Sequence, residues 1–118
     1  MSLERLNKYR VMWAIVFFDL PVTEKSDARA AQHFRKFLMQ EGFTMMQFSV
    51  YMRCCPSMEN ANVHLNRVRQ FLPVHGNVVL FTITDKQFGQ MQFYSNLEKK
   101  KEKSEDENSH SYEQLTIF

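Results

Sequence analysis

A single carboxylate stands where a buried strand is expected to end. Residues 11–18 are apolar without a break, Asp19 follows them, and Pro21 comes two places later. A short apolar run rich in aromatic and β-branched residues is typical of a strand buried on both faces. Because the carboxyl ends of strands are where α/β sheets present reactive groups, Asp19 is the first candidate for catalysis or metal binding. The alternative is that Asp19 only shapes the turn into the next element.

Basic side chains offer a second chemistry, contact with phosphate. Through Phe93 the chain holds 11 Lys and Arg against 7 Asp and Glu, and the remaining residues hold 4 against 6. This basic body suits a polyanionic partner, although an ordinary solvated surface has the same balance. Without interleaved aromatic residues, the cations favour backbone contacts on a duplex over stacking on single-stranded bases. The candidates are Lys25, Arg29, Arg35, Lys36, Arg53, His64, Arg67 and Arg69, with the Ser49 hydroxyl as a further donor.

Two amphipathic helices are expected to support these groups. The first follows Pro21, with Thr23 as its N-cap and Gly42 just beyond its C-cap. The second begins at the N-cap Ser57 and closes at Pro73. Their expected core faces are Ala30, Ala31, Phe34, Phe37 and Leu38 in the first helix, and Met58, Ala61, Leu65, Val68 and Leu72 in the second. Outside the second core face we expect His64, Arg67 and Arg69.

The remaining apolar segments predict strands. Residues 43–55 indicate two short strands, or one bent strand, with the break near Ser49. Residues 78–84 predict another strand that ends at Asp85, and residues 91–94 predict one more short strand. The order strand, helix, strand, strand, helix, strand predicts an α+β, ferredoxin-like βαββαβ fold with both helices on one face and extra C-terminal strands. We expect the first and last core strands to lie side by side in the middle of the sheet.

Helices on one face leave the opposite face of the sheet without a cover. The chain has 11 Phe and 8 Met, more bulky apolar residues than a small core needs. An identical sheet across a two-fold axis would cover this face, so we predict a symmetric homodimer packed through its sheets. The side chains that need this cover include Trp13, Ile15, Phe17, Val79, Phe81 and Ile83.

The chain is expected to divide into three parts. Residues 1–94 form the ferredoxin-like domain, residues 95–112 a flexible charged tether, and residues 113–118 a docking strand. An apolar strand on a polar tether suits addition to an exposed sheet edge, on this dimer or on another protein. The expected docking residues are Leu115, Ile117 and Phe118, and the alternative is a loose end without function.

Composition also bears on the compartment. The first ten residues are charged and unlike a signal peptide, and no apolar run is long enough to span a membrane. Cys54 and Cys55 are adjacent and unaccompanied, which supports neither a disulfide framework nor a zinc site. We therefore expect a cytoplasmic protein without membrane contact.

Three segments resemble the CRISPR-associated protein 2 family, the small subunit of the spacer-acquisition complex. They are F-D-L-P at residues 18–21, Q-F-S-V-Y-M-R at residues 47–53, and G-N-V-V-L-F-T-I-T-D-K-Q-F-G at residues 76–89. The likeness runs from about Tyr9 to Phe93, and the charged tether with its L-T-I-F ending is most similar to the type II versions.

The resemblance implies a symmetric dimer lying between two dimers of the first CRISPR-associated protein, the integrase. Together they hold a short double-stranded DNA and insert it into the CRISPR array. Isolated members are described as metal-dependent endonucleases acting on RNA or DNA, in which the aspartate that ends the first strand binds Mg²⁺. Here that residue is Asp19. Arg53 is the strongest single candidate for a DNA contact because it lies in a matched segment.

One aspartate per chain is too few for a tight Mg²⁺ site, but two Asp19 side chains could share an ion across a dimer axis. Such an ion would lower the pKa of a bound water and offset charge on phosphate. From the resemblance we expect a DNA-binding subunit that bridges integrase dimers and holds the prespacer duplex. Its metal-dependent endonuclease activity is expected to be dispensable for spacer acquisition.

Two other functions fit the same fold. The first is a stand-alone, toxin-type endoribonuclease of the mRNA interferase kind. The second is a regulatory ferredoxin-like module that binds a small ligand at a dimer interface, which ranks last because no Gly-rich or polar pocket pattern is visible.

Overall fold

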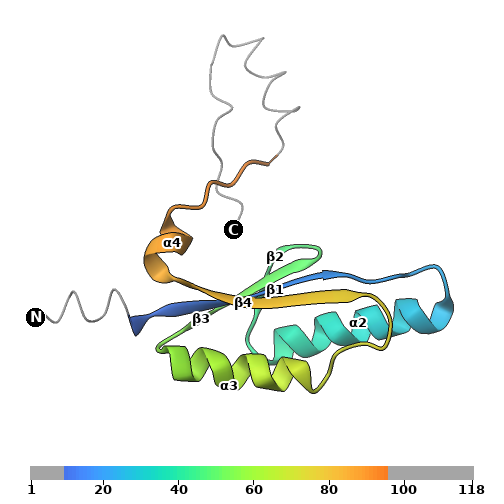
Figure 1. The fold of residues 1–118 in the computed structure, drawn as a ribbon. Helices are drawn as coiled ribbons and strands as arrows, with labels where there is room; N and C mark the ends of the chain where they lie inside the picture. The colour runs from blue at the N-terminus through green and yellow to red at the C-terminus, as the bar shows by residue number, and fades with distance from the viewer. Residues whose placement is uncertain (1–9, 96–118) are drawn as a thin grey trace, which may run out of the picture.

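The computed structural model describes residues 10–95. The four strands form one antiparallel sheet in the order β2-β3-β1-β4. Helices α2 and α3 both lie on one face of this sheet (Figure 1). The α+β class and the four-stranded antiparallel sheet are confirmed, and the homodimer stays a prediction. In chain order the elements are β1 (Met12–Asp19), α2 (Lys25–Gln40), β2 (Thr44–Gln47), β3 (Val50–Cys55), α3 (Met58–Arg69), β4 (Asn77–Thr84) and α4 (Asp85–Gly89).

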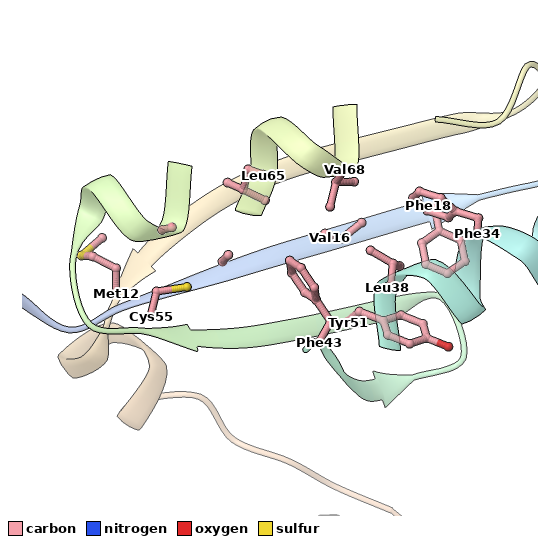
Figure 2. Packing of buried hydrophobic residues seen from close by; sticks show 12 residues of the cluster. Met12, Val16, Phe18, Phe34, Leu38, Phe43, Tyr51, Cys55, Leu65 and Val68 are labelled. Carbon is pink, nitrogen blue, oxygen red and sulfur yellow. The ribbon is translucent and has the colours of Figure 1, made fainter. Parts of the chain in front are cut away.

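The core lies between the sheet and the two long helices. Alternate residues of β1 face the helices because side chains of a strand point to opposite sides in turn. They meet Phe34 and Leu38 from α2, Leu65 and Val68 from α3, and Tyr51 from β3 (Figure 2). Most of the predicted helix stripes are therefore buried. The exceptions are Met58 and Leu72, which are exposed, and Ala30 and Phe37, which are half-buried.

The caps of the helices follow the sequence in part. Gly42 has φ +91°, and the bonds Phe43 N–H to Leu38 C=O and Gly42 N–H to Met39 C=O close α2 as a Schellman motif. Ser57 accepts a hydrogen bond from the Asn60 N–H at 3.1 Å, as predicted. The N-cap of α2 is Glu24 rather than Thr23, because the helix begins one residue later than expected.

Strand β4 lies at an edge of the described sheet, so its predicted central position is wrong. β1 and β3 are the inner strands, and β4 pairs with β1 alone. The apolar composition of β4 reflects contact on the helix side, where Val78 and Leu80 pack against the core. Composition reports burial of faces and does not report whether both edges are paired.

Residues 91–94 form no strand, which corrects another expectation. After β4 the chain turns into the short helix α4, which Thr84 and Gln87 begin with a capping box. The Thr84 hydroxyl accepts from the Gln87 N–H at 3.1 Å, and the Gln87 side chain accepts from the Thr84 N–H at 2.9 Å. This capping box begins a helix directly after β4.

Candidate functional site

Asp19 ends β1 on the face of the sheet opposite the helices. Phe18 and Val16 belong to the core on the helix side, so Phe17 and Asp19 point the other way. Asp19 is exposed and lines a shallow depression of about 290 Å³. Two other polar residues, Ser49 and Asn77, line the same depression, and its remaining walls are Phe17, Phe18, Val50 and Val79.

The backbone around Asp19 is fixed from both sides. On one side the Phe18 N–H donates to the Ser49 carbonyl at 3.0 Å, which carries the β1–β3 pairing into the β2–β3 turn. On the other side Asn77 is the register partner of Asp19 in β4. Gly76 precedes it with φ +102°, and a Cβ there would lie 2.7 Å from the Asp19 carbonyl oxygen. The fold therefore holds Asp19, Ser49 and Asn77 together.

The exposed lining of this depression is almost wholly apolar, and Asp19, Ser49 and Asn77 are its polar residues. A carboxylate, a hydroxyl and an amide oxygen are ligands that Mg²⁺ accepts, with waters and phosphate completing its octahedron. Within residues 10–95, however, no three His, Cys, Asp or Glu side chains gather into a metal-binding group. One copy therefore supplies a single carboxylate at this depression, which is too few for a tight Mg²⁺ site.

The sheet face that carries Asp19 is apolar and only partly covered. Phe17 is 42% exposed and Val79, its register partner, is 52% exposed. At the other end of the face α4 covers Trp13. The Phe88 ring stacks on the indole with centroids 3.7 Å apart, and Trp13 Nε1 donates to Asp85 Oδ1 at 2.8 Å. The uncovered part of the face is therefore the part next to Asp19.

Three of the predicted phosphate-binding residues share the outer side of α2. Lys25, Arg29 and Lys36 are four and seven residues apart, which places them in one line along a helix. All three are exposed, and no acidic or other partner is found for them within the described part of the chain. This line of cations is referred to below as the α2 basic line.

Arg35 and Arg53 instead make contacts inside the molecule. The Arg35 guanidinium lies 3.8 Å from the centroid of Phe48 and 5.4 Å from that of Phe18. Arg53 Nη1 donates to the Glu41 carbonyl at 3.1 Å, so it satisfies the C-terminal end of α2. The Arg53 side chain crosses Gly42, where a Cβ would collide with the guanidinium.

His64 is buried, at 8% exposure, and the expectation that it lies outside the packed side of α3 is wrong. Its Nδ1 lies 2.6 Å from Glu41 Oε2, to which Arg67 Nη1 also donates at 2.9 Å. Burial raises the pKa of the Glu41 carboxyl, but the bonds from His64 and Arg67 outweigh it and leave the pKa below its ordinary value. These residues join the end of α2 to α3, while Arg69 bonds Asn66 on its own helix.

Neither Asn77, which lines the depression at Asp19, nor Phe48 in the β2–β3 turn is singled out in the sequence analysis. Asn77 reaches Asp19 only through the pairing of β1 with β4, which no local pattern reveals. Phe48 has the side chain of a strand residue but lies exposed in the β2–β3 turn. Turn residues usually carry small or polar side chains, so an exposed phenyl ring there is the feature that could have drawn attention to it.

Comparison with known proteins assigns the family. The family model described as CRISPR associated protein Cas2 matches residues 12–91. The chain belongs to the Cas2 family. All three segments that carry the resemblance lie within this match, so that prediction is confirmed, while the type II assignment stays a prediction.

Several curated Cas2 proteins are close in sequence. The chain is 51% identical over 90 residues to the CRISPR-associated endoribonuclease Cas2 of Flavobacterium psychrophilum, covering 76% of this chain and 78% of that protein. It is 49% identical over 83 residues to the Parvibaculum lavamentivorans protein of the same name, covering 70% and 82%. The Streptococcus mutans protein of that name is 39% identical over 80 residues, covering 68% and 73%.

Two further expectations concern membrane spans and the C-terminal docking strand. In the Cas2 chain described here, residues 10–95 contain no helix with the length and hydropathy of a bilayer span. The docking residues Leu115, Ile117 and Phe118 lie outside the described residues, as does nearly all of the tether.

Proposed function

We propose that this Cas2-family chain is the DNA-binding subunit of a CRISPR spacer-acquisition complex. A ferredoxin-like homodimer bridges dimers of the CRISPR-associated integrase and holds the prespacer duplex. The α2 basic line is the observation that carries the proposal. Lys25 and Lys36 are eleven residues apart, about 16 Å along a helix. Because each DNA strand carries a phosphate every 3.4 Å or so of rise, a line of this length spans several phosphates.

The basic residues divide into two roles in this proposal. Lys25, Arg29 and Lys36 contact phosphate, since no described residue competes for them. Arg53 and Arg67 both donate to Glu41 at the end of α2, so their role is to stabilise the helix that carries the α2 basic line. Contacts to phosphate recognise the DNA backbone and do not discriminate between base sequences, which suits a subunit that must accept many spacers.

Duplex binding measured against salt tests the proposal. The combined variant Lys25→Gln, Arg29→Gln, Lys36→Gln should lower the slope of log affinity against log salt by about 0.9 for each phosphate that is no longer neutralised. Lys86→Gln, an exposed cation on α4, is the matched control and should leave the slope unchanged. The same variants are assayed for DNA integration with the partner integrase. An unchanged slope in the combined variant contradicts the assignment of the α2 basic line.

The uncovered sheet face supports the proposal that the chain forms a homodimer. A free apolar face next to Phe17 and Val79, and an apolar strand β4 at a sheet edge, are both aggregation hazards unless covered. A two-fold axis through this part of the face covers it with its own copy. The two Asp19 side chains, which lie at its border, then approach each other.

A second activity is supported by the depression at Asp19 and by the relatives, whose names describe endoribonucleases. We propose metal-dependent hydrolysis of a phosphodiester at this place. Paired Asp19 carboxylates, with Ser49 and Asn77 oxygens, would hold Mg²⁺, which when bound supplies an acidified water and charge neutralisation at phosphate. The apolar side chains of Phe17 and Val79 border these groups in the same depression.

The two activities are separated by one substitution. Asp19→Asn should abolish Mg²⁺-dependent RNA cleavage and leave duplex binding and integration intact, because the α2 basic line lies on the other side of the sheet. Glu59→Gln on the exposed side of α3 is the control. Cleavage that survives Asp19→Asn contradicts the assigned site. Cleavage that is abolished, together with no duplex binding even with the integrase, supports the stand-alone endoribonuclease instead.

A further inference from the structure

Strand β2 forms an open edge of the sheet beside exposed apolar side chains. It pairs with β3 alone, so the backbone along its other side has no partner strand within the described residues. Met39 of α2, Met45 of β2 and Phe48 of the β2–β3 turn are 55%, 48% and 67% exposed. Met45 is the register partner of the core residue Tyr51, which places Met45 on the helix side of the sheet. Met39, Met45 and Phe48 are called the β2 apolar patch below.

Helix α2 holds this patch in place. The Arg35 guanidinium lies 3.8 Å from the Phe48 ring centroid, and Arg35 Nε donates to the Phe48 carbonyl at 3.3 Å. Met39 follows Arg35 by four residues on the same helix, so the two are neighbours on its surface. Because the proposed dimer packs through the opposite face of the sheet, a second copy leaves the patch exposed. Apolar side chains along a free strand edge favour the addition of an extended segment as a further strand.

Residues 115–118 of this chain have the composition that such an edge requires. They read L-T-I-F, and because side chains alternate along a strand, Leu115 and Ile117 would point to the same side. Residues 96–114, which connect this segment to the described fold, can extend over roughly 60 Å. From β4 to β2 the sheet is only three strand spacings wide, about 14 Å. The segment can therefore reach β2 of its own chain.

Charge also matches the segment to this side of the molecule. Residues 104–118 contain four acidic residues and no Lys or Arg. The acidic residues are Glu105, Asp106, Glu107 and Glu113. The α2 basic line borders the patch, because Lys36 and Met39 are three residues apart on α2. Glu107 precedes Leu115 by eight residues, which span at most about 28 Å and can cover the line.

We propose that residues 115–118 add to the free edge of β2. Leu115 and Ile117 then pack on the β2 apolar patch, and the acidic residues lie over the α2 basic line. The other open edge, β4, is less suited, because its exposed Val79 lies on the face that the second copy covers. The docking goes beyond the proposed function and needs neither DNA nor metal. Its consequence is that this segment and a duplex compete for the α2 basic line.

Hydrogen exchange of the full chain tests the docking. The double variant Leu115→Asp, Ile117→Asp places charges against the patch, so the amides of residues 43–48 should exchange about tenfold faster than in wild type. Met39→Asp, which changes the patch from α2 and lies outside this peptide, should give the same increase. Thr116→Ser, whose side chain points away from the patch, is the matched control and should exchange as wild type.

Two results would overturn the docking. The first is an equal exchange rate of residues 43–48 in wild type and in the double variant. The second comes from the pure protein with benzoylphenylalanine in place of Phe118: photo-crosslinks should form to residues 39–48, and crosslinks confined to β4 would place the segment at the other edge.

A DNA duplex tests the position of the acidic residues. When added to wild type, it should raise the exchange of residues 43–48 by the same factor as the double variant. A duplex that binds without this increase would contradict their placement over the α2 basic line. If no duplex binds, the proposed function fails, while the exchange and crosslinking measurements still decide the docking.

Discussion

Among single residues, Gly76 controls the backbone on which Asp19 is placed. Its φ of +102° disfavours any other residue, and a Cβ would meet the Asp19 carbonyl oxygen and Leu20 at 2.7 Å. Gly76→Ala should therefore lower the free energy of unfolding by about 1–3 kcal/mol and reduce Mg²⁺-dependent cleavage, because the Asp19 backbone must shift. Gly89→Ala is the matched control, since a Cβ there meets nothing within 4 Å. Equal urea midpoints for the two variants would contradict this role.

The Glu41 carboxylate is the second residue with a measurable consequence. Its pKa is below the ordinary value in the folded chain, so its contribution to stability is present above the unfolded pKa and is lost as pH falls through the folded pKa. Glu41→Gln should cost about 1–2 kcal/mol at neutral pH, because His64 and Arg67 lose a charged acceptor. The cost should shrink as the pH falls below the ordinary carboxyl pKa and through the lowered pKa of Glu41 in the folded chain.

Urea unfolding at several pH values measures this change. Glu59→Gln, on the exposed side of α3, should show neither the loss nor its pH dependence. A loss in Glu41→Gln that is the same at neutral and acidic pH would show that the carboxylate charge is not what stabilises the α2–α3 junction.

At the scale of secondary structure, α4 is held to β1 by an aromatic contact and by the Trp13–Asp85 hydrogen bond. No residue of α4 is buried, and its Phe88 stacks on Trp13 of β1. Phe88→Ala should detach α4 and expose the indole, which red-shifts the emission of the chain's single tryptophan. Gln90→Ala, just after the helix, is the control. Unchanged emission in Phe88→Ala would mean that the Asp85 bond alone holds α4 in place.

The elements show where sequence is informative. The eight apolar residues before Asp19, the Ser57 cap and Gly42 are local signals, and each predicts its element correctly. The edge position of β4 and the partnership of Asp19 with Asn77 depend on strand pairing across more than fifty residues. The burial of His64 has no local signal, because its acceptor, Glu41, lies beyond the end of another helix. These distant contacts carry no local pattern, whereas the N-cap of α2 and the Thr84–Gln87 capping box that begins α4 are local features that the sequence prediction missed.

At the scale of the whole molecule, a homodimer can carry both proposed activities on different surfaces. Helices α2 and α3 cover one face of the sheet (Figure 1). The α2 basic line lies on the outer side of α2, and Asp19 lies on the opposite face of the sheet. A dimer packed through the Asp19 side leaves the basic line exposed on both outer surfaces. Duplex DNA and the hydrolytic site then use different surfaces, so one activity can be removed without the other.

The dimer itself is tested at Val79. This residue lies beside Phe17 on the uncovered face and lines the Asp19 depression. Val79→Arg would bury a charge between copies, so it should weaken dimerisation roughly a hundredfold in sedimentation equilibrium. Val74→Arg, on a loop side chain that is 90% exposed, is the matched control and should leave the dimer intact.

Cleavage should follow the dimer if two Asp19 carboxylates share one Mg²⁺. Val79→Arg should then lose Mg²⁺-dependent cleavage at concentrations where it is monomeric, and should regain part of it as the concentration rises. A monomeric Val79→Arg that cleaves as fast as wild type would show that one Asp19 suffices, and the shared-ion arrangement would be wrong.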